Sequence, residues 1–145
     1  MLNIILTCLV FSLLKTIDET DGYEFNQIFC ETIEELNKIA MKFVSHNDME
    51  SGHHILSFCE EITQPGKYGE FPLQRNKTFN NLACLYRRVG KPKGALNYLK
   101  TALTILSKNN LLHHSATTYL NLSAVQSQLG EYNSWFLSIF IFKGI

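Results

Sequence analysis

The residues best suited to chemistry are two adjacent histidine pairs, His53-His54 and His113-His114. Two imidazoles can share a metal ion when they lie at i and i+4 on one helix face, but adjacent helical residues point about 100° apart. No acid or thiol lies at a sequence spacing that would complete a metal site with both pairs. We therefore expect surface or loop histidines and no metal site.

Other patterns that resemble catalytic motifs are incomplete. Ser12-Leu13-Leu14-Lys15 matches S-x-x-K, but the S-D-N and K-T-G motifs of penicillin-binding enzymes are absent. The adjacent carboxylates Glu34-Glu35 and Glu60-Glu61 suit solvated helix faces. No G-x-G-x-x-G, P-loop or G-x-S-x-G motif occurs. The sequence predicts a non-catalytic protein without a cofactor.

Composition narrows the class of partner. The 145 residues carry 13 basic and 13 acidic side chains, so the formal net charge is zero. A balanced chain has no electrostatic basis for binding nucleic acid. The four cysteines, Cys8, Cys30, Cys59 and Cys84, form no C-x-x-C pair. We favour free buried thiols, which behave as small apolar groups, over disulfides or zinc, and expect a reducing, cytoplasmic compartment.

The elements that must position any site follow from a helical pattern in residues 76–105. Phe79, Leu82, Ala83 and Tyr86 lie at i, i+3, i+4 and i+7, which predicts one apolar helix face. A second stripe consists of Ala95, Leu96, Leu99, Ala102, Leu103 and Leu106. Between them, Gly90 suits the left-handed position after a helix and Pro92 suits the first turn of the next helix. The segment therefore predicts a helix hairpin.

The same pattern recurs along the chain. Residues 43 positions earlier keep its order of large, small, aromatic and turn-forming side chains: Leu36, Ile39, Ala40, Phe43, Asn47, Gly52, Leu56 and Cys59. Residues 40 positions later keep it in four of five places: Tyr119, Leu122, Ser123, Gln126 and Gly130. Such recurrence predicts an all-α array of antiparallel helix hairpins. We expect about three repeats, the last incomplete, at residues 33–62, 76–107 and 116–133 of a domain spanning 28–133.

The pattern resembles the tetratricopeptide repeat family. The match is carried by Leu82-Ala83, Tyr86, Gly90, Ala95 and Ala102. The spacings of 43 and 40 exceed the family's period of about 34 residues, as in the long repeats of kinesin light chains, where a run similar to Asn80-Asn81-Leu82-Ala83 also occurs. The family's proline at the end of the second helix is missing from every copy. The resemblance implies a right-handed superhelical solenoid.

A concave groove lined by the first helices is the predicted site. Residues outside the apolar stripe should face it: Lys77, Asn80 or Asn81, Cys84, Arg87 and Arg88 in the central copy, Glu34, Asn37, Lys38 and Met41 before it, and Thr117, Asn121, Ala124 and Gln128 after it. Groove asparagines hold the peptide backbone in peptide-binding members of the family, which implies that role for Asn81 and Asn121. Basic side chains would favour an acidic partner. Ordinary solvated residues are the alternative, and a carboxylate clamp is not supported because the third helix offers no basic residue.

These observations predict a non-catalytic scaffold that binds a peptide or partner segment. Two alternatives stay open: an adaptor attached to a membrane through its apolar ends, and a helical accessory part of a larger enzyme or motor complex. No partner follows from sequence.

Both ends of the chain depart from the repeat pattern. Residues 1–27 comprise an apolar segment, 1–14, and a polar linker. The segment is short for a membrane span, which needs about 20 residues, and lacks a positive start and clear cleavage site. We expect a helix of an incomplete preceding repeat or a wrongly assigned first exon. Residues 134–145 form an apolar tail without helical periodicity, which we interpret as a gene-model error or, alternatively, a membrane-surface or partner-binding tail.

Overall fold

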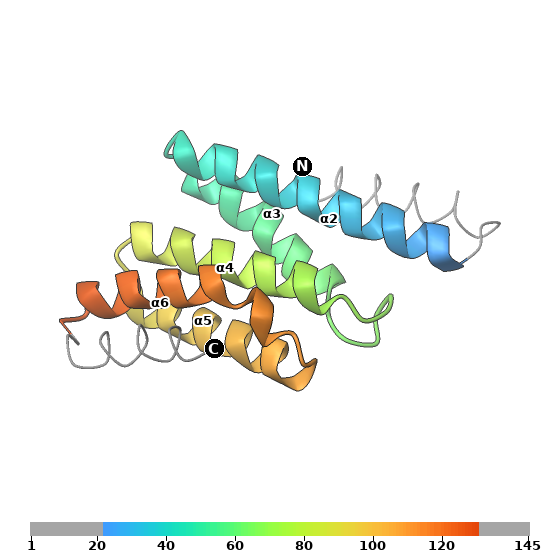
Figure 1. The fold of residues 1–145 in the computed structure, drawn as a ribbon. Coiled ribbons are helices and arrows are strands. Elements are labelled where there is room, and N and C mark those ends of the chain that lie inside the picture. Colours follow the sequence, from blue (N-terminus) through green and yellow to red (C-terminus); the bar gives the residue numbers. More distant parts are fainter. Residues whose placement is uncertain (1–21, 131–145) are drawn as a thin grey trace.

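The structure is a computed structural model, and it describes residues 22–130. These residues form a succession of helices without a strand (Figure 1). The elements are α2 (Gly22–Ser45), α3 (Met49–Ile62), α4 (Pro72–Arg88), α5 (Pro92–Lys108), the short 3-10 turn η1 (Leu112–His114) and α6 (Ala116–Gln128). None of these helices is long and apolar enough to cross a membrane.

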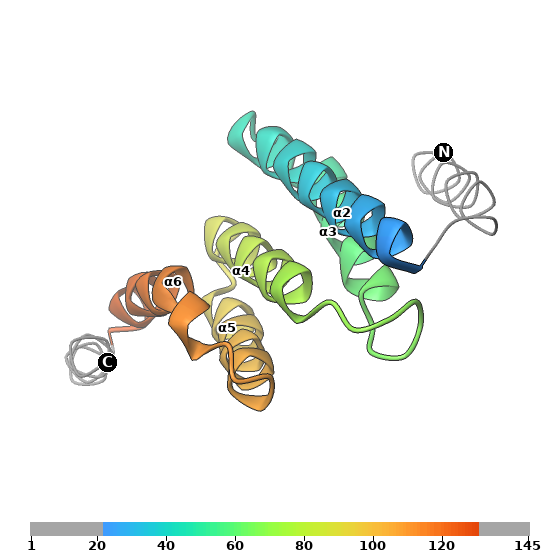
Figure 2. The same ribbon diagram turned by 45° about the vertical axis from the view of Figure 1, so that its right-hand side comes forward.

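The helices stack as hairpins in two layers. Helices α2, α4 and α6 lie side by side in one layer, and α3 and α5 form the other (Figure 2). Helix α4 is central, because it contacts α2, α3, α5 and α6. The predicted all-α repeat array is confirmed, with the α4–α5 hairpin at its middle.

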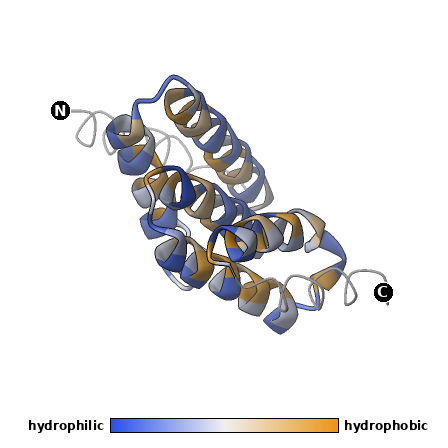
Figure 3. Ribbon diagram, turned by 90° about the vertical axis from the view of Figure 1, so that its left-hand side faces the viewer, coloured by the Kyte–Doolittle hydropathy of each residue, from blue (hydrophilic) through white to orange (hydrophobic). Residues whose placement is uncertain are grey.

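The core consists of two apolar clusters that meet at α4. Ile33, Leu56 and Leu82 are fully buried in the first cluster, between α2, α3 and α4. Leu99 and Val125 belong to the second, between α4, α5 and α6. The apolar residues accordingly lie mainly on helix sides that face neighbouring helices (Figure 3). Each hairpin therefore buries part of its apolar stripe between its own two helices and part against the neighbouring hairpin.

The predicted turn between α4 and α5 is confirmed. Gly90 has φ of +73°, the left-handed conformation that glycine adopts without strain. Lys91 N donates to Tyr86 O at 2.8 Å, and Pro92 opens α5. Asp48 caps the start of α3: its carboxylate accepts from Ser51 N at 3.0 Å, and this bond lowers the pKa of the Asp48 carboxyl.

Two helix starts differ from the sequence prediction. Residues 22–26 were expected to be linker, but α2 begins at Gly22. This extension places Phe25 next to Phe29. The ring centroids of Phe29 and Phe71 lie 4.4 Å apart. The loop before α4 was expected to continue to residue 75, but Pro72 is the first residue of that helix. Proline is well suited to this position, because the first helical N–H has no partner within the helix.

Two predicted core residues of α2 are exposed. Ile39 and Phe43 were placed on the packing stripe, but their side chains are 45% and 36% exposed. The equivalent residues of α4 are covered: Leu82 is fully buried, and the Tyr86 ring lies 5.9 Å from the ring of His53 in α3. No described helix precedes α2 to cover the corresponding face. The predictions for residues 1–21 and 131–145 lie outside the described residues.

The close contact of α3 with α2 generates a stability prediction. A Cβ atom added at Gly52 would meet Val44 Cγ2 at 2.6 Å and Ala40 O at 3.1 Å. We expect Gly52→Ala to lower the free energy of unfolding by about 1–3 kcal/mol, because overpacking outweighs the gain of roughly 1 kcal/mol in helix propensity.

Urea unfolding followed by circular dichroism measures this change. Thr104→Ala, at an exposed site of α5, serves as the control and should be neutral or slightly stabilising. A Gly52→Ala protein as stable as the wild type would show that α2 and α3 are not in close contact there.

Candidate peptide-binding face of the first helices

A buried carboxamide joins α2 to α4. Asn37 is fully buried, and its Nδ2 donates to Thr78 Oγ1 at 3.0 Å and to Ile33 O at 2.9 Å. Its Oδ1 accepts from Asn81 Nδ2 at 2.8 Å. Helices α2, α4 and α6 are the first helices of the predicted repeats. One asparagine of α2 therefore binds both a threonine and an asparagine of α4, the next first helix.

The same arrangement joins α4 to α6. Asn80 Nδ2 donates to Thr118 Oγ1 at 2.8 Å and to Asn76 O at 3.0 Å. Asn80 Oδ1 accepts from Asn121 Nδ2 at 2.9 Å. We call the two sets, Asn37–Thr78–Asn81 and Asn80–Thr118–Asn121, the asparagine ties. Each tie contains the same two hydrogen bonds between helices, with the same donor and acceptor atoms.

The ties place polar groups in the protein interior without leaving them unsatisfied. No buried side-chain nitrogen or oxygen among residues 22–130 lacks a hydrogen-bond partner. A bond of this kind contributes about 0.5–1.5 kcal/mol net, but a buried group that loses its partner costs about 1–3 kcal/mol. The ties therefore favour the one register of the first helices in which every partner is present.

The buried asparagines correct part of the groove prediction. Asn37 was expected to face the groove, and so was either Asn80 or Asn81. Asn37 is fully buried and Asn80 is only 5% exposed, and both side chains point between helices. Asn81 and Asn121 are half-buried, and each gives one amide hydrogen to a tie. A carboxamide has two such hydrogens and an acceptor oxygen. Whether Asn81 and Asn121 contact a partner stays a prediction.

The remaining candidates lie mostly in two stripes of equal spacing. On α4, Lys77, Asn81, Cys84 and Arg88 follow one another at i, i+4, i+7 and i+11, and on α6 Thr117, Asn121, Ala124 and Gln128 do the same. The side chains of Lys77 and Cys84 are half-buried. The exposed members are Thr117, Ala124, Gln128 and Arg88. We call these sets the α4 stripe and the α6 stripe. Arg87, also half-buried, lies outside the α4 stripe, on the side of Asn80.

The charged candidates differ in how far they are paired. Lys77 Nζ lies 3.5 Å from Glu34 Oε2 across the α2–α4 boundary, with both side chains nearly half exposed. Such a pair contributes little to stability. Arg88 Nη1 donates to Val44 O at 3.0 Å, at the carboxyl end of α2. Within residues 22–130 neither Arg87 nor Arg88 forms an ion pair with a carboxylate.

Sequence reasoning missed Thr78 and Thr118, although their separation of 40 residues matches the repeat spacing. It also did not recognise that Leu120 occupies the place on α6 that Asn80 occupies on α4. Leu120 is 69% exposed. Helix α6 therefore offers a leucine where the preceding first helices each supply the central asparagine of a tie.

Three other kinds of candidate site were suggested by residue type: cysteine thiols, metal ligands and glycosylation sequons. Cys59 is fully buried, and burial raises the pKa of its thiol to about 12. The part of the chain that the structure describes contains no group of three His, Cys, Asp or Glu side chains that could hold a metal. The asparagines of the two glycosylation sequons, Asn76 and Asn121, are both engaged in hydrogen bonds between helices. A glycan at either would break these bonds.

The fold and its repeated ties define a helical-repeat protein. The sequence model of the tetratricopeptide repeat matches residues 77–109, which cover most of α4 and all of α5. The central hairpin is thus a tetratricopeptide repeat, and the described helices around it form an all-α array consistent with that family. Tetratricopeptide repeats in general mediate protein interactions and are not catalytic. Comparisons with curated proteins and with solved structures gave no significant match.

Removal of a central asparagine tests the ties. We expect Asn80→Ala to lower the free energy of unfolding by about 1–3 kcal/mol, because Thr118 and Asn121 lose their buried partner. The measurement is urea unfolding of the full chain. Asn97→Ala, at an exposed site of α5, is the matched control and should change stability by less than about 0.5 kcal/mol. Equal effects of the two substitutions would mean that the tie adds nothing.

Proposed function

We propose that this chain is a non-catalytic scaffold that binds an extended peptide segment of a partner protein across α4 and α6. The observation that carries the proposal is the alignment of the α4 and α6 stripes, with Asn81 and Asn121 in equivalent places. The asparagine ties hold both carboxamides before any ligand arrives. Such preorganisation favours binding, because less side-chain freedom is lost on association.

The spacing of the stripes suits a chain in the extended conformation. Packed helices lie about 8–10 Å apart, and an extended peptide advances roughly 3.3 Å per residue. A peptide crossing from Asn81 to Asn121 would therefore meet the two carboxamides about three residues apart. Carboxamides can donate to and accept from a peptide backbone, so this contact needs no particular ligand side chain.

The charged residues favour an acidic ligand. Arg87 and Arg88 lie in the last turn of α4 without a carboxylate partner among the described residues. Lys77, by contrast, is already close to Glu34. An acidic side chain or terminal carboxylate would therefore be placed at the Arg87–Arg88 end of the α4 stripe, where guanidinium groups form strong charge-assisted bonds.

Peptide selection with a blocking substitution tests the proposal. Random peptides displayed on phage are selected against the full chain, and their affinities are measured for the wild type and for Ala124→Glu. Ala124 is exposed in the α6 stripe and takes part in no tie, so glutamate adds bulk and negative charge without removing a tie. We expect the selected peptides to be acidic and Kd to rise at least about tenfold, or 1.4 kcal/mol.

Thr104→Glu adds the same side chain at an exposed site of α5, in the other layer, and should leave Kd unchanged. Equal loss of affinity in both variants, or selected peptides that ignore Ala124→Glu, would exclude binding across α6. A selection that yields basic peptides would contradict the proposed ligand charge.

A further inference from the structure

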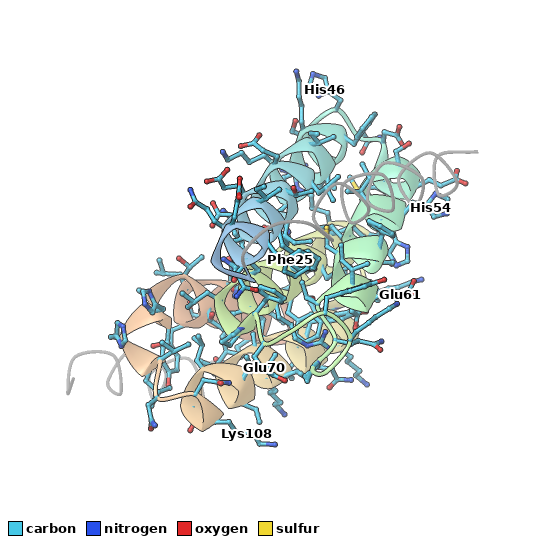
Figure 4. All side chains as sticks on the ribbon, turned by 90° about the vertical axis from the view of Figure 1, so that its right-hand side faces the viewer. Phe25, His46, His54, Glu61, Glu70 and Lys108 are labelled. Atoms are coloured by element: carbon cyan, nitrogen blue, oxygen red, sulfur yellow. The ribbon has the colours of Figure 1, made fainter. Side chains whose placement is uncertain are left out.

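The outer face of α2 carries an apolar groove that no other helix among residues 22–130 covers. Its volume is about 570 Å³, and it is lined by Ile39, Lys42, Phe43, His46 and Asp48. His46 lies in the turn that joins α2 to α3 (Figure 4). Ile39 and Phe43 are the large apolar side chains of this groove, and both are exposed.

The repeat relation identifies the kind of structure that would cover this groove. Ile39 and Phe43 correspond to Leu82 and Tyr86 of α4, 43 residues later. Leu82 is fully buried, and the Tyr86 ring lies 5.9 Å from the ring of His53 in α3. The helix that precedes α4 in the chain thus occupies this position in the central repeat. The matching face of α2 has the side chains for the same contact.

We propose that residues 2–14 of this chain lie against the Ile39–Phe43 face of α2. This segment precedes α2 as α3 precedes α4, and its 13 residues compare with the 14 of α3. Only Asn3, Thr7, Cys8 and Ser12 interrupt its aliphatic and aromatic side chains. Covering one large apolar side chain completely contributes about 1.5–3 kcal/mol, which favours such a contact over exposure.

The length of the connection permits this placement. At a helical rise, 13 residues measure about 20 Å, and the 17 residues from Gly22 to Ile39 measure about 26 Å. A segment that reaches Ile39 therefore ends within about two turns of the start of α2. Residues 15–21 can span more than about 20 Å when extended, which is ample for the return to Gly22.

An occupant from the same chain fits the size of the face better than a second copy does. A stable interface buries about 800 Å² on each partner, whereas this groove presents chiefly two large apolar side chains. A tethered segment avoids most of the translational and rotational cost of association. Docking within the chain is therefore favoured even over a small apolar area.

Cross-linking of the full chain tests the proposal. Cys8 is kept as the only native thiol by Cys30→Ser, Cys59→Ala and Cys84→Ser, and a second thiol is introduced by Ile39→Cys. A short bis-maleimide is added to dilute protein, and linked peptides are identified by mass spectrometry. We expect intrachain linkage to Cys8 at least about tenfold above that of a matched variant carrying Thr101→Cys, on the exposed side of α5.

Linkage mainly between chains would assign the face to a second copy, and linkage no greater than in the control would assign it to another partner or a membrane; either result overturns the proposal. Since three cysteine substitutions could weaken folding, a second measurement uses the wild-type cysteines. Phe43→Glu should raise the rate at which Cys8 reacts with a maleimide, whereas Thr104→Glu should not. An unchanged rate would also overturn the proposal.

Discussion

A carboxamide buried between helices must have partners for its donors and its acceptor, and this requirement governs the first-helix layer. Asn37 and Asn80 each meet it with the same three contacts: a carbonyl of their own helix, a threonine hydroxyl and an asparagine amide of the next first helix. Apolar packing alone tolerates small shifts along a helix axis, since it is not directional. Hydrogen bonds of fixed geometry do not, so the ties select one register for α2, α4 and α6.

The same bonds connect the fold to its candidate function. Asn81 and Asn121 belong to the ties and also to the α4 and α6 stripes, whose other side chains are exposed or half-buried. A partner that met these side chains would meet groups that the fold has already oriented. Within residues 22–130 the pattern of central asparagines does not continue at α6, where Leu120 occupies that place. The first and last of the described first helices thus differ: α2 carries an apolar groove and α6 carries an exposed leucine.

Most of the fold could be predicted because apolar spacing and turn chemistry are local signals. Gly90 and Pro92 marked the central turn, and the recurrence of eight positions marked the stacking of hairpins. Contacts between distant residues were not predictable in this way. The early start of α2 brings Phe25 against Phe29, which in turn packs on Phe71, and Ile39 is exposed on a face that no helix among residues 22–130 covers.

The candidate site was only partly predictable, because Asn80 and Asn81 are adjacent and point about 100° apart on the helix. Sequence alone left open which of them is buried, and the pairing with Thr118 decides this.

The central claim, that the asparagine ties set the register of the first helices, is tested most directly by double-mutant cycles. Asn80→Ala is combined with Thr118→Val in one cycle, and Asn37→Ala with Thr78→Val in the other. Each pair should show a favourable coupling energy of about 1 kcal/mol, and the two values should be similar because the bonds are the same. Additivity within roughly 0.3 kcal/mol in both cycles would contradict the claim.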